Sequence, residues 1–209
     1  MEVVEGKSVG ELKAGLDYLK EPENVLWVTQ DMYEGYRRYT YDTFPNARIV
    51  TDKFHVLRLL SGSILKERKK IVGSNADRKA RSLLLMNSKK LKYFERDTIA
   101  RYLEKYPTLK ELYDYKEMLH SFYNIKNPRQ ASQVMDSIII GASMAQTIEV
   151  KRLGKTLQSW KKEILNYFDQ RITNARLEGF NNKASLVRKQ AYGYKNLNNY
   201  RLQLLSVCS

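Results

Sequence analysis

The chain is poor in the residues that build disulfide frameworks and thiolate metal sites. It has a single cysteine, Cys208, and two histidines, His55 and His120. One thiol cannot form an internal disulfide, and two histidines cannot make a His-rich metal site. This composition excludes a disulfide-stapled secreted domain and fits a reducing compartment. We therefore expect a cytoplasmic protein.

Long apolar runs are also missing. The longest, from Ser137 to Ala145, is far shorter than the ~20 residues that a membrane-spanning helix needs. The N-terminus lacks the pattern of a signal peptide. We therefore expect a soluble protein with no membrane partner.

Acidic residues are too few to balance the basic ones. Lys and Arg number 37 against 23 Asp and Glu, which gives a net charge of +14 in a chain that is 43% hydrophobic. The basic residues are spread along the chain and interleaved with 15 tyrosines, which favours nucleic acid over a membrane surface as the partner. A ribosome-associated or merely soluble basic protein stays open, because charge bears on partners and not on fold.

The first fifty residues have an α/β pattern. Apolar spacing predicts a helix over Val9–Lys20, a strand over Val25–Thr29, a helix over Met32–Thr43 and a second strand over Ala47–Thr51. At 209 residues the chain is long enough to bury a core.

From Lys53 onward the pattern is helical. Val56, Leu60 and Ile64 form an apolar stripe, whereas Arg58, Lys66 and Lys69 fall on the other side. Solvation and DNA contact are both open for this basic face. Further helices are predicted over 78–91, 95–106, 109–123, 128–142 and 148–167.

Two carboxylates follow the predicted strands. Asp31 comes after the first strand and Asp52 after the second, with His55 close behind. Open α/β sheets bind ligands at the carboxyl ends of their strands. Both aspartates could instead cap a helix, and His55 could be a packed core residue. Position alone leaves these alternatives open.

The segment from Asn174 to Arg201 is predicted to begin as an amphipathic helix. Its buried stripe would comprise Leu177, Phe180, Ala184, Val187 and Ala191. A polar line on a different face would comprise Glu178, Asn182, Ser185 and Lys189. A solvated glutamate at position 178 is the alternative to a functional one.

Two segments resemble a known family. FPNARIVTDKFHV (44–56) and ARLEGFNNKASLVRKQAYGYKNLNNYRLQLL (175–205) are similar to transposases of the insertion-sequence family ISL-three, which are of the DDE class. The resemblance implies an α/β, RNase H-like core interrupted by a mostly helical insertion. The corresponding division is 1–55 for core strands, 56–170 for the insertion and 171–209 for the C-terminal helical part of the core.

The resemblance also implies a chemistry, namely metal-dependent phosphodiester cleavage and strand transfer at transposon ends. Two Mg²⁺ or Mn²⁺ ions about 3.5–4 Å apart would stabilise the attacking and leaving oxygens. Glu178 matches the final glutamate of the triad and Asp31 the second aspartate, so these two are the expected metal ligands. Asp52 is the rival second aspartate.

The chain departs from the family pattern in two respects that bear on activity. Ala184-Ser185 stands where the family usually reads Ile-Lys, which removes a positive charge from the helix face that carries Glu178. The family's first aspartate lies upstream of the region that residues 1–19 resemble, so we expect an N-terminally truncated transposase that binds its ions weakly. The alternative function is a non-catalytic, basic DNA-binding remnant or regulator. A third reading is an interaction module whose charge serves only solubility, and self-association stays open.

Basic and tyrosine residues are the expected DNA contacts. They are Arg58, Lys66, Lys69, Lys183, Arg188, Lys189, Tyr194, Lys195 and Arg201. Cations would bind phosphates, and Tyr194 could stack on an exposed base. The alternative for the neighbouring tyrosines, Tyr192 and Tyr200, is a place in the core, with Gly193 ending the helix.

The distributed charge predicts salt-sensitive binding to duplex DNA that is largely independent of sequence. Counterion release requires the logarithm of the affinity to fall with the logarithm of salt concentration by about 0.9 per phosphate neutralised. Titrating a duplex at several salt concentrations measures this slope. An affinity that does not change with salt would contradict the prediction.

Overall fold

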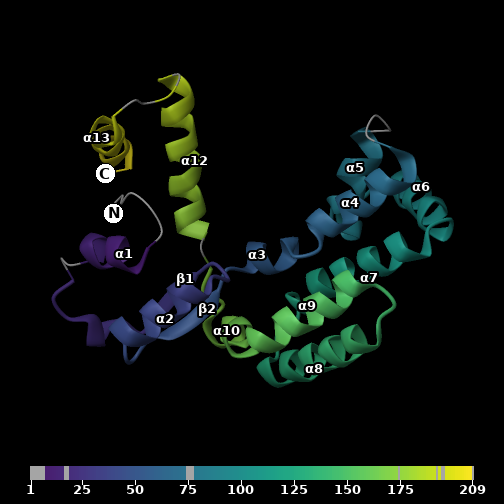
Figure 1. Cartoon of the computed structure of the whole chain (residues 1–209), viewed down its shortest axis with the longest axis horizontal. Helices are drawn as coiled ribbons and strands as arrows, with labels where there is room; N and C mark the ends of the chain where they lie inside the picture. Colours follow the sequence, from purple (N-terminus) through teal and green to yellow (C-terminus); the bar gives the residue numbers. More distant parts are fainter. Residues whose placement is uncertain are drawn as a thin grey trace. The chain divides into compact units, whose positions relative to one another are not determined.

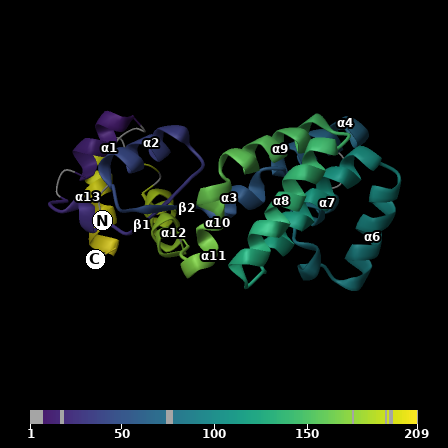
Figure 2. The same cartoon turned by 90° about the horizontal axis from the view of Figure 1, so that it is seen from below.

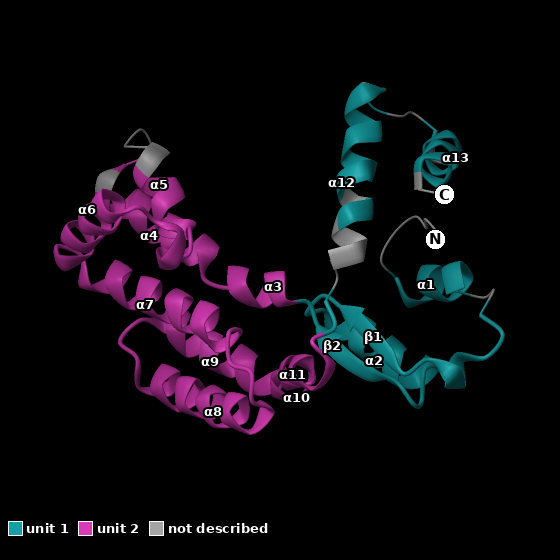
Figure 3. Cartoon of the chain, turned by 180° about the vertical axis from the view of Figure 1, so that it is seen from behind, with its two compact units in different colours: residues 1–52, 172–209 teal, residues 53–171 magenta. Residues whose placement is uncertain are grey.

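The computed structural model describes residues 8–16, 19–73, 78–173, 175–191, 193 and 196–208, with the backbone alone at 72, 78–79, 175–178, 181, 197 and 208. The chain divides into two compact units, residues 1–52 with 172–209 (unit 1) and residues 53–171 (unit 2) (Figure 3). The sequence placed its boundaries after residues 55 and 170. The role of the middle segment as an insertion stays a prediction.

The N-terminal part of unit 1 alternates helices and strands (Figure 1). Its elements are α1 (Val9–Leu16), the 3₁₀ helix η1 (Pro22–Asn24), β1 (Trp27–Gln30), α2 (Glu34–Thr43) and β2 (Arg48–Thr51). The predicted α/β pattern is confirmed here. The strands pair in parallel, with Trp27 opposite Arg48 and Gln30 opposite Thr51.

Apolar side chains of β2 and α2 hold this part together. Ile49 and Val50 are each 1% exposed, as expected for β-branched residues in a parallel strand. On α2 and just beyond it, Tyr39 and Phe44 are buried and meet edge to face at 6.2 Å. The two strands and this helix therefore share one small core.

The C-terminal part of unit 1 is a helical hairpin of α12 (Ala175–Gln190) and α13 (Leu197–Cys208). Val187 and Leu204 are buried, and Lys183 Nζ donates to the Val207 carbonyl at 3.2 Å. Between the helices Gly193 has φ +101°, a conformation that glycine adopts without strain.

The predicted stripe on α12 is only partly correct. Val187 is buried, Phe180 and Ala184 are half-buried, and the Leu177 side chain lies outside the described residues. Ala191 is exposed, so its predicted burial is wrong. The helix ends at Gln190, and the residue after it does not continue the helical face.

All the regular secondary structure in the described residues of unit 2 is helical (Figure 2). Its elements are α3 (Lys53–Arg58), α4 (Ser61–Val72), α5 (Arg78–Leu85), the 3₁₀ helix η2 (Ser88–Lys90), α6 (Tyr93–Glu104), α7 (Pro107–Phe122), α8 (Pro128–Met144), α9 (Ile148–Ser159), α10 (Lys161–Leu165) and α11 (Tyr167–Gln170). None of the helices that the structure describes is long and apolar enough to cross a membrane.

Two predicted helices of unit 2 are in fact divided. The segment 148–167 breaks at Trp160, which has φ −106° and ψ 14°, and again at Asn166. The segment 78–91 breaks near Asn87, whose side chain accepts from the Lys89 N–H at 2.9 Å. Asn competes with the helical backbone in this way, and the apolar spacing did not show it.

The core of unit 2 confirms the predicted stripe of α3 and α4. Val56 and Ile64 are fully buried and Leu60 is 2% exposed. Helices α8 and α9 lie side by side in both views (Figures 1 and 2). Their close approach needs Gly154, because a Cβ at that position would be 2.8 Å from the Ala142 Cβ.

A buried lysine ties α7 to the segment that follows α5. Lys116 is 1% exposed, and its Nζ donates to the carbonyls of Leu84 at 2.9 Å and Met86 at 2.7 Å. The Glu117 carboxylate lies 2.7 Å from the same nitrogen. Burial lowers the pKa of Lys116, but each ammonium proton has an acceptor, so the charge is tolerated.

A glutamate of α7 caps the start of α9. The Glu111 carboxylate accepts from the N–H groups of Gln146 at 2.8 Å and Thr147 at 2.7 Å. Partial burial would raise the pKa of Glu111, but these N–H groups and the charge of Lys151 outweigh it and lower the pKa. The first of these bonds joins α7 to the turn before α9, across 35 residues of sequence.

Glu111→Gln should therefore destabilise the protein at pH 7 by about 1–3 kcal/mol, since one buried donor loses its acceptor. The folded pKa lies below the ordinary value of 4.5. The stabilisation by charge is thus present above about pH 4.5 and is lost as the pH falls through the folded pKa. Denaturant unfolding at pH 7 and at lower pH measures the difference. Glu104→Gln, at an exposed glutamate of α6, is the control and should change little.

Candidate metal site and nucleic-acid surface

Two aspartates stand side by side where the parallel strands end. Asp31 follows β1 and Asp52 follows β2, and the last rung of the ladder pairs Gln30 with Thr51. The Asp52 N–H donates to the Gln30 carbonyl at 2.8 Å. A carboxylate oxygen of Asp31 lies within 4.8 Å of one of Asp52. The sequence offered them as rivals, whereas the structure brings them together.

Asp31 does not occupy the N-cap position of α2. Helix α2 begins at Glu34, and its N-cap is Tyr33, whose side chain makes no capping hydrogen bond. The Asp31 backbone carbonyl accepts from the Tyr33 N–H at 2.8 Å.

The donor set fits a divalent cation. Mg²⁺ prefers carboxylate oxygens at about 2.0–2.1 Å, so two ligands of one ion lie up to about 4.2 Å apart. The separation of the two carboxylates, within 4.8 Å, allows both to reach a shared ion after a small side-chain rotation. Asp52 is only 9% exposed, which limits the water that competes for it.

The side chains of Gln30 and Thr51, the last residue pair of the two strands, could make further hydrogen bonds. Within the described residues, the buried atoms Gln30 Nε2 and Thr51 Oγ1 have no hydrogen-bond partner. The Gln30 Oε1 accepts from the Thr40 hydroxyl at 2.8 Å, which anchors the amide to α2. Buried polar atoms without partners are uncommon in folded proteins, and here they directly precede the two aspartates.

His55 lies on the first turn of α3, three residues after Asp52. Its side chain is exposed. The alternative of a packed core histidine is therefore wrong. An exposed imidazole next in sequence to a carboxylate pair is chemically able to bind a metal ion.

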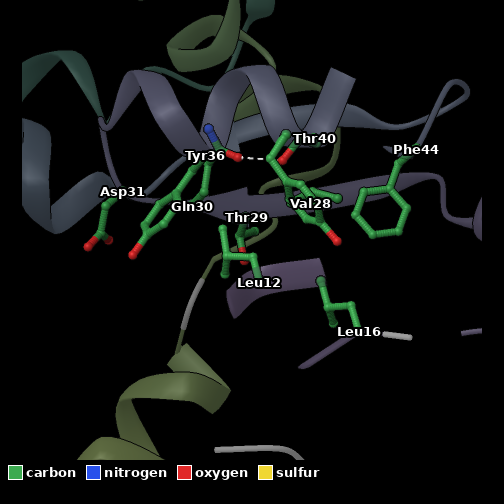
Figure 4. A pocket seen from close by; sticks show the side chains of 10 residues that line it. Leu12, Leu16, Val28, Thr29, Gln30, Asp31, Tyr36, Thr40 and Phe44 are labelled. Carbon is green, nitrogen blue, oxygen red and sulfur yellow. Dashed lines mark hydrogen bonds between the residues drawn. The ribbon is translucent and has the colours of Figure 1, made fainter. Parts of the chain in front are cut away.

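An apolar cavity of about 260 Å³ adjoins Asp31 (Figure 4). Leu12 and Leu16 of α1 line one side, and Val28 of β1 lies opposite. Tyr36 of α2 and Asp31 line the same cavity. No pattern in the sequence predicts this cavity, because its walls come from separate elements that meet only in the fold.

Glu178 lies within α12, but its side chain is outside the described residues. The part of the site that the structure describes is thus the pair Asp31 and Asp52. The sequence-based role of Glu178 as third carboxylate stays a prediction.

Most predicted DNA contacts are on the surface. The exposed ones are Arg58, Lys66, Lys69, Lys183, Arg188 and Lys189. Arg201 is half-buried, and Lys183 also donates to the Val207 carbonyl within the hairpin. Tyr194 and Lys195 lie outside the described residues. DNA contact by these residues stays a prediction.

Comparison with known proteins identifies a family. A family model described as a transposase, DDE_Tnp_ISL3, matches residues 1–204. No curated protein and no solved structure matches the chain. The matched range includes the strands, the two aspartates, helix α12 and the first part of α13.

Proposed function

Because the chain belongs to the DDE_Tnp_ISL3 family of transposases, we propose that it acts in metal-dependent phosphodiester cleavage and strand transfer at transposon ends. One observation carries the proposal. The carboxylates of Asp31 and Asp52 lie within 4.8 Å of each other at the end of two parallel strands. The partner is the DNA of the transposon ends, which the net charge of +14 favours.

The same proposal covers the fold. The strands of unit 1 and helix α12 would belong to an RNase H-like core, and unit 2 would be the helical insertion. Chain connectivity supports this reading, because unit 1 stops after Asp52 and resumes at Ile172. The α/β pattern of residues 27–51 is compatible with it.

The ion proposed is Mg²⁺, with Mn²⁺ as its substitute. Asp31 and Asp52 would hold it, Glu178 would add the third carboxylate by family resemblance, and His55 would be a further donor because it follows Asp52 by one helical turn. When bound, divalent ions stabilise the attacking and leaving oxygens of an in-line displacement.

The protein's own residues have separate tasks in this proposal. The carboxylates concentrate negative charge at one edge of the sheet, inside an otherwise basic protein. The exposed cations Lys66 and Lys69 on α4 attract the phosphate backbone without reading sequence. In this proposal the acidic residues bind the ion, and basic residues elsewhere in the chain bind the DNA.

Asp31→Asn and Asp52→Asn should each weaken Mn²⁺ binding by about tenfold or more, since each removes one charged oxygen ligand from a shared ion. Isothermal titration with Mn²⁺ measures the affinity. Asp42→Asn, at an exposed aspartate of α2, is the matched control. Equal affinities in all four proteins would refute the pair as the ion site, and His55→Gln tests the histidine in the same way.

Glu178→Gln in the complete element should reduce transposition frequency in cells by about a hundredfold or more, since loss of a group at the reaction centre costs several kcal/mol. Duplex binding by the purified chain should persist, because the substitution removes no positive charge. Asp31→Asn should behave alike and Asp42→Asn should not. Undiminished transposition with Glu178→Gln would show that this glutamate is not a ligand.

A non-catalytic DNA-binding regulator is the second candidate, favoured by the exposed cations. It predicts that the carboxylate substitutions leave transposition unchanged, whereas Lys66→Glu with Lys69→Glu alters it through DNA binding. Measuring both sets in the same assay separates the two functions.

A further inference from the structure

The first and last residues of unit 2 both lie over one aromatic cluster. Lys53 Nζ is 5.3 Å from the ring centroid of Tyr123 and 5.8 Å from that of Tyr167. Arg171 Cζ is 5.7 Å from the centroid of Tyr167 and 5.8 Å from that of Phe168. Tyr167 is therefore shared by the two cations, although they are far apart in sequence.

The cluster is a fixed platform. Phe122 ends α7 and Tyr123 follows it, whereas Tyr167 and Phe168 begin α11. Their exposures lie between 1% and 5%. Tyr123 meets Tyr167 at 5.2 Å and Phe122 meets Phe168 at 4.8 Å, both near edge to face. Such ring pairs add stability beyond the area they bury, so the cations rest on rings that have little room to move.

Arg171 is held in one conformation by further bonds. Its φ is +52°, in the left-handed region that residues other than glycine seldom adopt. Its N–H donates to the Tyr167 carbonyl at 2.8 Å, and its guanidinium donates to the Ile125 carbonyl. A costly backbone conformation persists where the surroundings determine it, as these contacts do.

Each cation is adjacent in sequence to a segment that carries, or leads to, a proposed ligand of the ion. Lys53 directly follows Asp52, and Arg171 is followed by Ile172 and Thr173, which lead to α12. The first residue of unit 2 and its last residue therefore both contact this aromatic cluster. Neither cation needs to contact the ion or the DNA to influence the carboxylates.

We propose that Lys53, Arg171 and the rings of Tyr123, Tyr167 and Phe168 form a junction clamp that positions the two segments flanking unit 2. Lys53 is then a positioning residue for Asp52, and Arg171 for the start of the segment that carries Glu178. The role of the clamp in ion binding rests on the proposed function. The mechanical coupling of the two junctions does not.

The direction of the change in Mn²⁺ affinity distinguishes a positioning role of Lys53 from a simple electrostatic effect of its charge. Lys53 carries a positive charge next to a proposed cation ligand, so its removal would by electrostatics alone strengthen Mn²⁺ binding. If Lys53 positions Asp52, its removal should instead weaken Mn²⁺ binding. Lys53→Met should weaken Mn²⁺ binding by about threefold to tenfold, within the range of a lost cation–π contact. Lys53→Arg keeps a cation over the rings and should restore the affinity.

The measurement is Mn²⁺ titration of the full 209-residue chain carrying each substitution. Lys155→Met, which removes the same charge from an exposed site on α9, is the matched control and should not weaken binding. Tighter binding by Lys53→Met, or equal weakening by Lys155→Met, would overturn the positioning role.

Hydrogen exchange tests the coupling without any metal. In Lys53→Met the Arg171 amide, bonded to the Tyr167 carbonyl, should exchange faster by about threefold or more, because the shared ring loses one of its two cations. Arg171→Met should in turn speed exchange at the Asp52 amide. Tyr167→Phe keeps the ring and should change neither rate.

If each substitution affects only its own junction, the clamp is refuted. If the wild-type chain binds no Mn²⁺ while exchange at the two junctions is coupled, the proposed metal site fails and the clamp stands. Unfolding midpoints of all variants, measured alongside, should stay close to wild type. A large common loss of stability would assign these residues to general packing and overturn the specific role.

Discussion

Parallel pairing of β1 with β2 is the constraint on which the candidate site depends. Parallel strands run in the same direction, so their carboxyl ends reach the same edge of the sheet. The register pairs Gln30 with Thr51, and this places the next residue of each strand, Asp31 and Asp52, side by side. A shift of one residue would turn one aspartate to the other face. The buried side chains of Ile49 and Val50 oppose such a shift.

The parallel arrangement also requires a connection that returns to the start of the sheet. Helix α2 supplies it, and Tyr39 and Phe44 bury the helix against the strands. The same elements form a wall of the cavity beside Asp31. The geometry of the carboxylates and the shape of their surroundings thus have a common origin in the packing of α2 against β1 and β2.

Unit 2 consists of many short helices, and buried or partly buried polar contacts join some of them at their ends. Lys116 donates to the carbonyls of Leu84 and Met86 at and just after the end of α5, and Glu111 accepts from the N–H groups of Gln146 and Thr147 just before α9. Each contact replaces water at a helix terminus, where four backbone groups lack intrahelical partners. At the two ends of the unit, Lys53 and Arg171 lie over the same aromatic cluster.

The sequence by itself determined what depends on neighbours a few residues away. Apolar periodicity located both strands and the stripe of Val56, Leu60 and Ile64, and the motifs around Asp52 and Glu178 identified the family. Only the tertiary structure decided what depends on distant residues: that Asp31 and Asp52 share one edge, that the helix predicted over 148–167 is divided, and that Lys53 and Arg171 meet at Tyr167. Spacing along a chain records local geometry. The packing of segments far apart in sequence is decided by the whole fold, and no local pattern reports it.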